Sequence, residues 1–118
     1  MIYIDGVLIP VKAGTTKETY AGFAEKIAPI FKDHGAIRVV DCWGDDVPDG
    51  TVTDFRRAVA AEDGETVVFS WIEWPDKATR DAGMANVRED PRMQPSDMAM
   101  PIDGKRMIFG GFEAVVDL

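Results

Sequence analysis

The segment Glu65–Trp74 constrains the fold more than any other part of the chain, because it is the strongest strand signal in the sequence. Most of its residues are valine, phenylalanine, tryptophan, isoleucine or threonine, which favour β-strands, and Pro75 ends it. Its apolar residues fall on both faces, with Val67, Phe69 and Trp71 on one and Val68 and Ile72 on the other. A strand with one face in water would alternate apolar and polar residues. We therefore expect a central strand in a sheet that is covered on both sides.

The length of 118 residues suits a single domain with one core, spanning 1–118. Hydrophobic residues make up 46% of the chain and charged residues 29%, which is ordinary for a globular protein. We find no internal repeat and no linker that would divide the chain.

The net charge of -8 argues against two classes of partner. Nucleic acids and anionic membrane surfaces both attract positively charged proteins, so neither is expected as a partner. The first residues, Met1–Gly6, lack the basic start of a signal peptide, and no apolar run is long enough to span a bilayer. The single cysteine, Cys42, suits a reducing compartment. These features together predict a cytoplasmic protein.

Six further elements are predicted from periodicity and capping residues. In chain order they are a strand at Ile2–Val11, a helix from Thr15 to His34, a strand at Ala36–Trp43, a short helix at 54–59 after the cap Asp54, a helix from Asp76 to Glu89, and a strand at Lys105–Val116.

Three details of these elements can be checked in the structure. Thr15 and Glu18 have the spacing of a capping box, so we expect Thr15 to cap the first long helix. Pro29 should kink that helix, because proline removes one backbone hydrogen bond. The pair Gly110–Gly111 predicts a bulge in the last strand.

Apart from the short helix at 54–59, the order is strand, helix, strand, strand, helix, strand, which is the ferredoxin-like βαββαβ pattern of the α+β class. In this topology the four strands form an antiparallel sheet with the first and third strands in the centre. The helices can cover only one of its faces. We therefore expect a second copy of the chain to cover the other face, which gives a homodimeric α+β barrel.

Short segments throughout the chain carry a resemblance to one protein family. They are Tyr3–Gly6, His34–Ala36, Gly44–Pro48, Glu65–Trp71, Asp90–Met93, Met100–Met107 and Gly110–Phe112. With these segments the chain resembles the DUF1428 family of uncharacterised bacterial proteins, in the dimeric α/β-barrel group. The resemblance implies the ferredoxin-like fold and a homodimer, and it implies no reaction.

Three residues are candidates for catalysis, each with a structural alternative. His34 could act as a general base near neutral pH, or it could be a helix-end residue favoured by the helix dipole. Cys42 could be a nucleophile, or a small buried hydrophobic residue. Asp5 interrupts an apolar strand, where a carboxylate needs a partner. We expect Arg106 or Lys105 to pair with it, either to fix the strand register or beside a cavity.

No metal or cofactor is expected. Asp45, Asp46 and Asp49 lack the spacing of a calcium loop and are typical of turns. With His34 as the only histidine, the chain has no two-histidine metal site, and it contains no glycine-rich phosphate loop.

Two interpretations of function stay open, and whether the protein is an enzyme stays open with them. In the first, the barrel encloses a cavity that binds or transforms a small apolar or aromatic molecule without a metal, and the apolar loop Arg92–Asp103 acts as a lid. Its expected ligand-binding residues are Tyr3, Asp5, Cys42, Trp71 and Arg106. In the second, the protein is a structural or interaction protein, and the barrel face is only a packed dimer interface without a ligand.

Overall fold

Four antiparallel strands form one sheet in the order β2-β3-β1-β4, which confirms the predicted ferredoxin-like α+β topology. The computed structural model describes residues 1–93 and 100–118. The elements are β1 (Tyr3–Val11), α1 (Lys17–Asp33), β2 (Arg38–Trp43), α2 (Phe55–Ala58), β3 (Thr66–Trp74), α3 (Lys77–Glu89), the 3-10 turn η1 (Pro91–Met93) and β4 (Ile108–Glu113).

Side-chain caps set the starts of the three α-helices. The side chains of Thr16, Asp54 and Asp76 accept hydrogen bonds from backbone N–H groups of the first turns of α1, α2 and α3. The caps of the second and third helices are those predicted. The first is one residue later than expected, because Thr16 Oγ1, and not Thr15, accepts from the Thr19 N–H at 3.1 Å.

Helix α1 runs from Lys17 to Asp33 with Pro29 inside it, and the kink expected at this proline stays a prediction. The bulge predicted in the last strand is absent. Strand β4 has no bulge, because its pairing with β1 is continuous from Leu8–Ile108 to Tyr3–Glu113. A glycine is needed at position 111 for a different reason, because neighbouring side chains pass close to the backbone there. A Cβ at this position would collide with the Tyr3 hydroxyl and with the Arg80 guanidinium.

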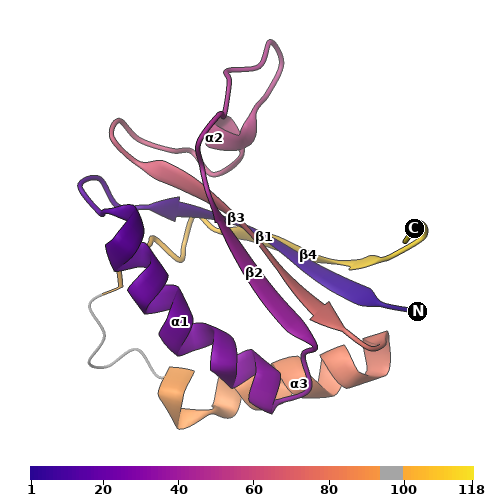
Figure 1. The fold of residues 1–118 in the computed structure, drawn as a ribbon. Helices are drawn as coiled ribbons and strands as arrows, with labels where there is room; N and C mark the ends of the chain where they lie inside the picture. Colours follow the sequence, from indigo (N-terminus) through magenta and orange to yellow (C-terminus); the bar gives the residue numbers. More distant parts are fainter. Residues whose placement is uncertain (94–99) are drawn as a thin grey trace.

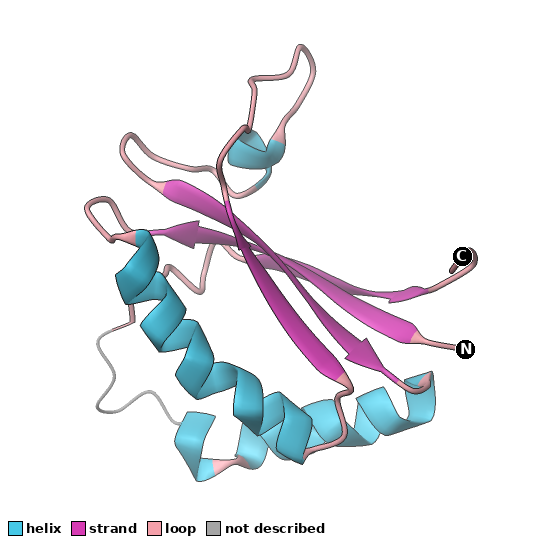
Figure 2. Ribbon diagram, in the orientation of Figure 1, coloured by secondary structure: helices cyan, strands magenta, loops and turns pink. Residues whose placement is uncertain are grey.

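Both long helices lie on the same side of the sheet, as Figure 1 shows, and Figure 2 separates the helical layer from the strand layer. The buried core lies between these layers. One cluster includes Ile9, Val11, Tyr20 and Val68, and the other is centred on Trp74. No helix within the described part of the chain is both long and apolar enough to cross a membrane.

The face of the sheet away from α1 and α3, which we call the open face, is uncovered in the single chain. Phe69 on β3 is 47% exposed, and Ile108 and Phe112 on β4 are 44% and 61% exposed. We expected both faces of β3 to be covered. Within one chain the helices cover one face, and the open face has no cover.

Helix α3 approaches the sheet most closely at Gly83. A Cβ added there would lie 2.5 Å from the Trp74 ring and 2.6 Å from the carbonyl oxygen of His34, so only glycine fits. Trp74 itself is 0% exposed. Gly83 has a low intrinsic helix propensity, but helix α3 requires it in order to pack against Trp74.

We predict that Gly83→Ala lowers the free energy of unfolding by about 2 kcal/mol, because the methyl group overpacks the contact between α3 and Trp74. Chemical denaturation followed by tryptophan fluorescence measures this change.

Gly22→Ala is the matched control, since Gly22 lies inside α1 with nothing within 4 Å of an added Cβ. Alanine should stabilise that helix by roughly 1 kcal/mol. Equal stabilisation by both substitutions would contradict the packing role of Gly83.

Candidate functional site

A cavity of about 270 Å³ lies between α1 and the covered face of the sheet, and we call it the helix-side cavity. Most of its wall is apolar, and the larger side chains of that wall include Val7, Ile9, Phe23, Ile27, Ile72 and Ile102. Helix α1 contributes the small residues Ala24 and Ala28 at the same cavity. Short side chains on the helix leave room between helix and sheet.

Two polar side chains meet in this wall. The Tyr20 hydroxyl donates a hydrogen bond to Asp41 Oδ1 at 2.7 Å. Asp41 lies on β2 directly opposite Ser70 of β3, and Ser70 also lines the cavity. An apolar cavity with a few convergent polar groups is the usual form of a small-molecule site.

Burial fixes the protonation state of the tyrosine. Tyr20 is 4% exposed, and this burial, together with the nearby Asp41 charge and their hydrogen bond, raises the pKa of the Tyr20 hydroxyl far above its usual value. Tyr20 therefore stays a neutral hydrogen-bond donor at physiological pH. It positions Asp41 and does not serve as a base.

The segment after α3 supplies the rest of the cavity wall. Met93 and Met100, at the two ends of the interval 94–99, line the cavity together with Met107. Half of the loop that we predicted as a lid, residues 94–99, lies outside the described residues. The described ends of that loop do lie against the cavity.

Asp5 is held by a different partner from the one predicted. Arg80 of α3 donates to Asp5 Oδ1 through Nη2 at 2.7 Å, and the Trp74 indole donates to Oδ2 at 2.9 Å. The prediction of Arg106 or Lys105 was wrong, because β4 runs antiparallel to β1 and brings Gly111 beside Asp5. The Asp5–Arg80 pair ties α3 to the sheet.

Tyr3 belongs to the same cluster, since the Arg80 guanidinium lies over its ring at 5.1 Å from the centroid. The structure thus brings Tyr3 and Asp5 together, and both were predicted to bind the ligand. Their polar groups, however, face the half-buried Arg80 and do not line the helix-side cavity.

Cys42 and Trp71 lie on the open face. Trp71 lines a groove of about 660 Å³ that crosses β1, β3 and β4, and its indole donates to Glu73 at 3.0 Å. Cys42 is exposed and pairs in register with Phe69. Neither residue approaches the cluster of Tyr3 and Asp5, which faces the helices.

His34 belongs to a hydrogen-bonded cluster at the end of α1. Its Nε2 lies 2.8 Å from Asp90 Oδ2, and Arg92 bridges Asp90 and Asp33. The bonds from Arg92, and then from His34, hold the pKa of the Asp90 carboxyl well below its usual range. His34 lies away from Cys42, so the structure does not bring the two together as a catalytic pair.

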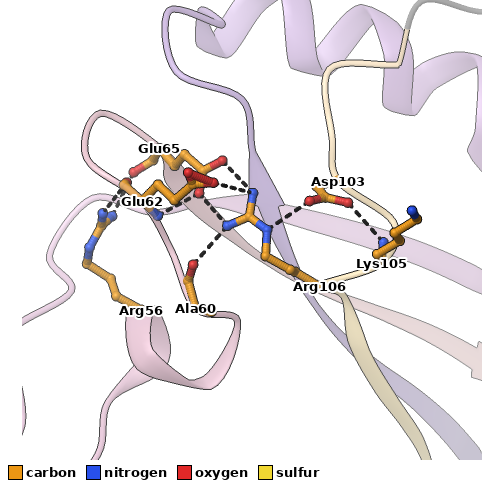
Figure 3. Close-up of polar contacts among 7 residues, drawn as sticks. All are labelled: Arg56, Ala60, Glu62, Glu65, Asp103, Lys105 and Arg106. Carbon is orange, nitrogen blue, oxygen red and sulfur yellow. Dashed lines mark hydrogen bonds and ion pairs between the residues drawn. The ribbon is translucent and has the colours of Figure 1, made fainter.

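Arg106 joins two loops at one end of the sheet, as Figure 3 shows. Its guanidinium donates to both carboxylate oxygens of Glu65, each at 2.7 Å, and to Asp103 at 2.8 Å. It also donates to the Ala60 carbonyl at 2.8 Å. Through these bonds Arg106 holds the loop before β3 and the loop before β4 together, so its role in the structure is that of a clamp.

The predicted ligand-binding residues therefore occupy three separate places, and none of them lines the helix-side cavity. The sequence interpretation missed Tyr20, Asp41 and Ser70. Asp41 carried the same signal as Asp5, an acid inside an otherwise apolar strand. Among residues 1–93 and 100–118, no three histidine, cysteine or acidic side chains come together as a metal site requires.

The Glu65–Arg106 clamp predicts a pH-dependent stability. The hydrogen bonds from Arg106 lower the pKa of Glu65 from 4.5 to about 2. Since the folded pKa is the lower one, the ionised carboxylate stabilises the fold fully above about pH 4.5, and this contribution is lost as the pH falls towards 2. Glu65→Gln should lower the free energy of unfolding by about 2 kcal/mol at pH 7.

Urea denaturation between pH 7 and pH 3 measures this effect, and the gap between wild type and Glu65→Gln should narrow below pH 4.5. Asp63→Asn in the same exposed loop is the matched control and should leave stability unchanged. A gap that stays constant across this range would show that the Glu65 charge is not responsible.

Comparisons with known proteins place the chain in a family. The model of a protein family of unknown function, DUF1428, matches residues 2–104. The uncharacterised protein YbaA of Escherichia coli K12 is 55% identical over 117 residues, covering 99% of both chains, and YbaA of Shigella flexneri matches equally well.

The fold also matches a solved structure. The crystal structure of a dimeric ferredoxin-like protein from an uncultured marine organism aligns with a TM-score of 0.65, covering 99% of this chain and 98% of the other. Its sequence identity is 13%, so the match concerns the fold alone. The family match and the YbaA relatives show that the chain is a member of the DUF1428 family of proteins of unknown function.

Proposed function

We propose that this protein is a homodimer that binds a small apolar or aromatic molecule in the helix-side cavity of each chain. The observation that carries the proposal is the composition of that cavity wall, which is apolar except for a few side chains such as Tyr20, Asp41 and Ser70. Such walls take up the body of a ligand by burial and orient it by a few hydrogen bonds.

The cavity volume limits the ligand. A cavity of roughly 150 Å³ is enough for benzene, and typical drug-sized sites begin at roughly 300 Å³. A volume of about 270 Å³ therefore suits one ring with a short substituent, or a short aliphatic chain. The site differs in place from the first expectation, because it lies between helix and sheet and not between two sheets.

The open face supports the homodimer. Its groove is lined almost entirely by apolar side chains, and Phe55 of α2 adds to it by packing its ring edge-on against Phe69. Apolar patches of this kind mark contact surfaces. A second copy of the chain is the occupant that the fold favours, since the marine protein with the same fold is a dimer.

The alternative is an interaction protein with no ligand. In that case the open face would still be the dimer interface, and the helix-side cavity would have no role. The polar pair Tyr20–Asp41 favours the ligand, because it gives an otherwise apolar wall the few convergent polar groups that are typical of a small-molecule site.

We predict that native mass spectrometry of the purified protein gives the mass of two chains. Phe69→Glu places a charge in the middle of the open face and should give a monomer with unchanged circular dichroism, because Phe69 is 47% exposed in the single chain. Val52→Glu, at a position that is 90% exposed, is the control and should stay dimeric. A wild-type monomer at micromolar concentration would refute the homodimer.

For the ligand, the probe is ethylbenzene, followed by methyl NMR of the isoleucines. Ethylbenzene should shift the methyl signals of Ile27, Ile72 and Ile102, which line the cavity. Ala28→Leu fills the cavity from α1 and should abolish these shifts.

Ala82→Leu, on the exposed side of α3, is the control and should leave ethylbenzene binding unchanged. Wild-type protein that shows no shifts up to the solubility limit of ethylbenzene would leave the interaction protein as the better interpretation.

A further inference from the structure

We infer that the ligand of the helix-side cavity carries a protonated amine, bound by the carboxylate of Asp41. This inference rests on the proposed function and adds the chemical class of the ligand. It follows from how the charges around the cavity are paired.

Asp41 is the acidic residue of the cavity wall, and its side chain is half-buried. Its Oδ1 accepts the hydrogen bond from Tyr20. Among the described residues, no cationic nitrogen lies within 4.0 Å of either carboxylate oxygen. A carboxylate in an apolar wall with one neutral donor is stabilised by a further donor, and most strongly by a cation.

The cationic residue of the same wall is already paired. Arg92 donates to Asp90 through Nε at 3.0 Å and Nη2 at 2.8 Å, and to Asp33 through Nη1 at 2.9 Å. Its charge is therefore satisfied at the end of α1. The cavity does not offer an unpaired cation to an anionic ligand.

A second basic residue lies on the outer side of Asp41. Lys17 borders a shallow groove between α1 and β2 to which Tyr20 and Asp41 also contribute. This groove shares Tyr20, Ala24, Ala28, Val39 and Asp41 with the wall of the helix-side cavity, and the Lys17 ammonium is not within ion-pair distance of Asp41. Asp41 therefore remains the acceptor for a group that enters from the cavity.

The neighbouring hydroxyls suit such a ligand. Tyr20 uses its proton on Asp41, which leaves its oxygen as an acceptor, and the Ser70 hydroxyl lies in register with Asp41 on the next strand. An ammonium group carries three donors and no acceptor. Its hydrogen-bonding needs are thus complementary to a carboxylate flanked by two hydroxyl oxygens, while its apolar body contacts Ile27 and Ile72.

Three probes of similar size and different charge test the inference: 2-phenylethylamine, ethylbenzene and 3-phenylpropionate. The amine should bind the wild type about tenfold more tightly than ethylbenzene, as expected for one charge-assisted hydrogen bond. The anion should bind most weakly. NMR titration of the cavity methyl groups gives all three dissociation constants.

Two variants locate the effect. Asp41→Asn keeps an acceptor for the Tyr20 hydroxyl and should reduce the preference for the amine over ethylbenzene to within about twofold. Tyr20→Phe leaves the carboxylate in place, so the preference for the amine should persist. If Asp41→Asn does not fold, the comparison of the three probes on the wild type still decides whether the cavity prefers an amine.

The possible failures are distinguishable. Binding of ethylbenzene with no preference for the amine, or a preference for 3-phenylpropionate, would overturn the amine and leave the proposed binding function intact. A preference for the amine that survives Asp41→Asn would overturn the role of Asp41. No binding of any probe would overturn the proposed function itself.

Discussion

A four-stranded sheet has two faces, and in this protein α1 and α3 can cover only one of them. The uncovered face carries Phe69, Ile108 and Phe112, each 44% exposed or more. Burying a side chain of this size contributes roughly 2 kcal/mol, so leaving several in water is costly. The placement of the polar clusters follows the same division: Asp5 and Asp41 both face the helices, where partners for them exist. The open face is left to apolar contact, and this asymmetry is the reason to expect a second copy of the chain.

The covered face is packed in two different ways. Near Trp74 the helix α3 contacts the sheet through Gly83. There the Asp5 carboxylate accepts hydrogen bonds from Arg80 and from the Trp74 indole. Along α1 the residues facing the sheet include Ala24 and Ala28, and the space that they leave becomes the helix-side cavity. Close approach fixes the position of one helix, while small side chains on the other leave volume. The same interface therefore provides both rigidity and room for a ligand.

Much of the fold could be predicted from the sequence, because strand composition and capping residues are local signals. The central position of Glu65–Trp74 and the caps Asp54 and Asp76 needed no knowledge of distant contacts. The partner of Asp5 could not be predicted in this way, because it depends on the antiparallel register and on which helix residue reaches the strand. The candidate site was missed for a related reason. Tyr20 belonged to a helical apolar stripe and Asp41 to another strand, and only the packing of α1 on β2 brings them together.

The proposed dimer interface and the proposed ligand site lie on opposite faces of the same strand. Ser70 and Ile72 of β3 face the helix-side cavity, whereas Phe69 and Trp71, their neighbours in the chain, face the open groove. This alternation follows from the period of two in a strand. The two proposals thus depend mainly on different side chains, so evidence for one does not weaken the other. A homodimer that closes the open face would still leave the helix-side cavity in each chain. Within that cavity Asp41 accepts a neutral hydrogen bond from Tyr20, and a protonated amine on the ligand would supply the opposite charge.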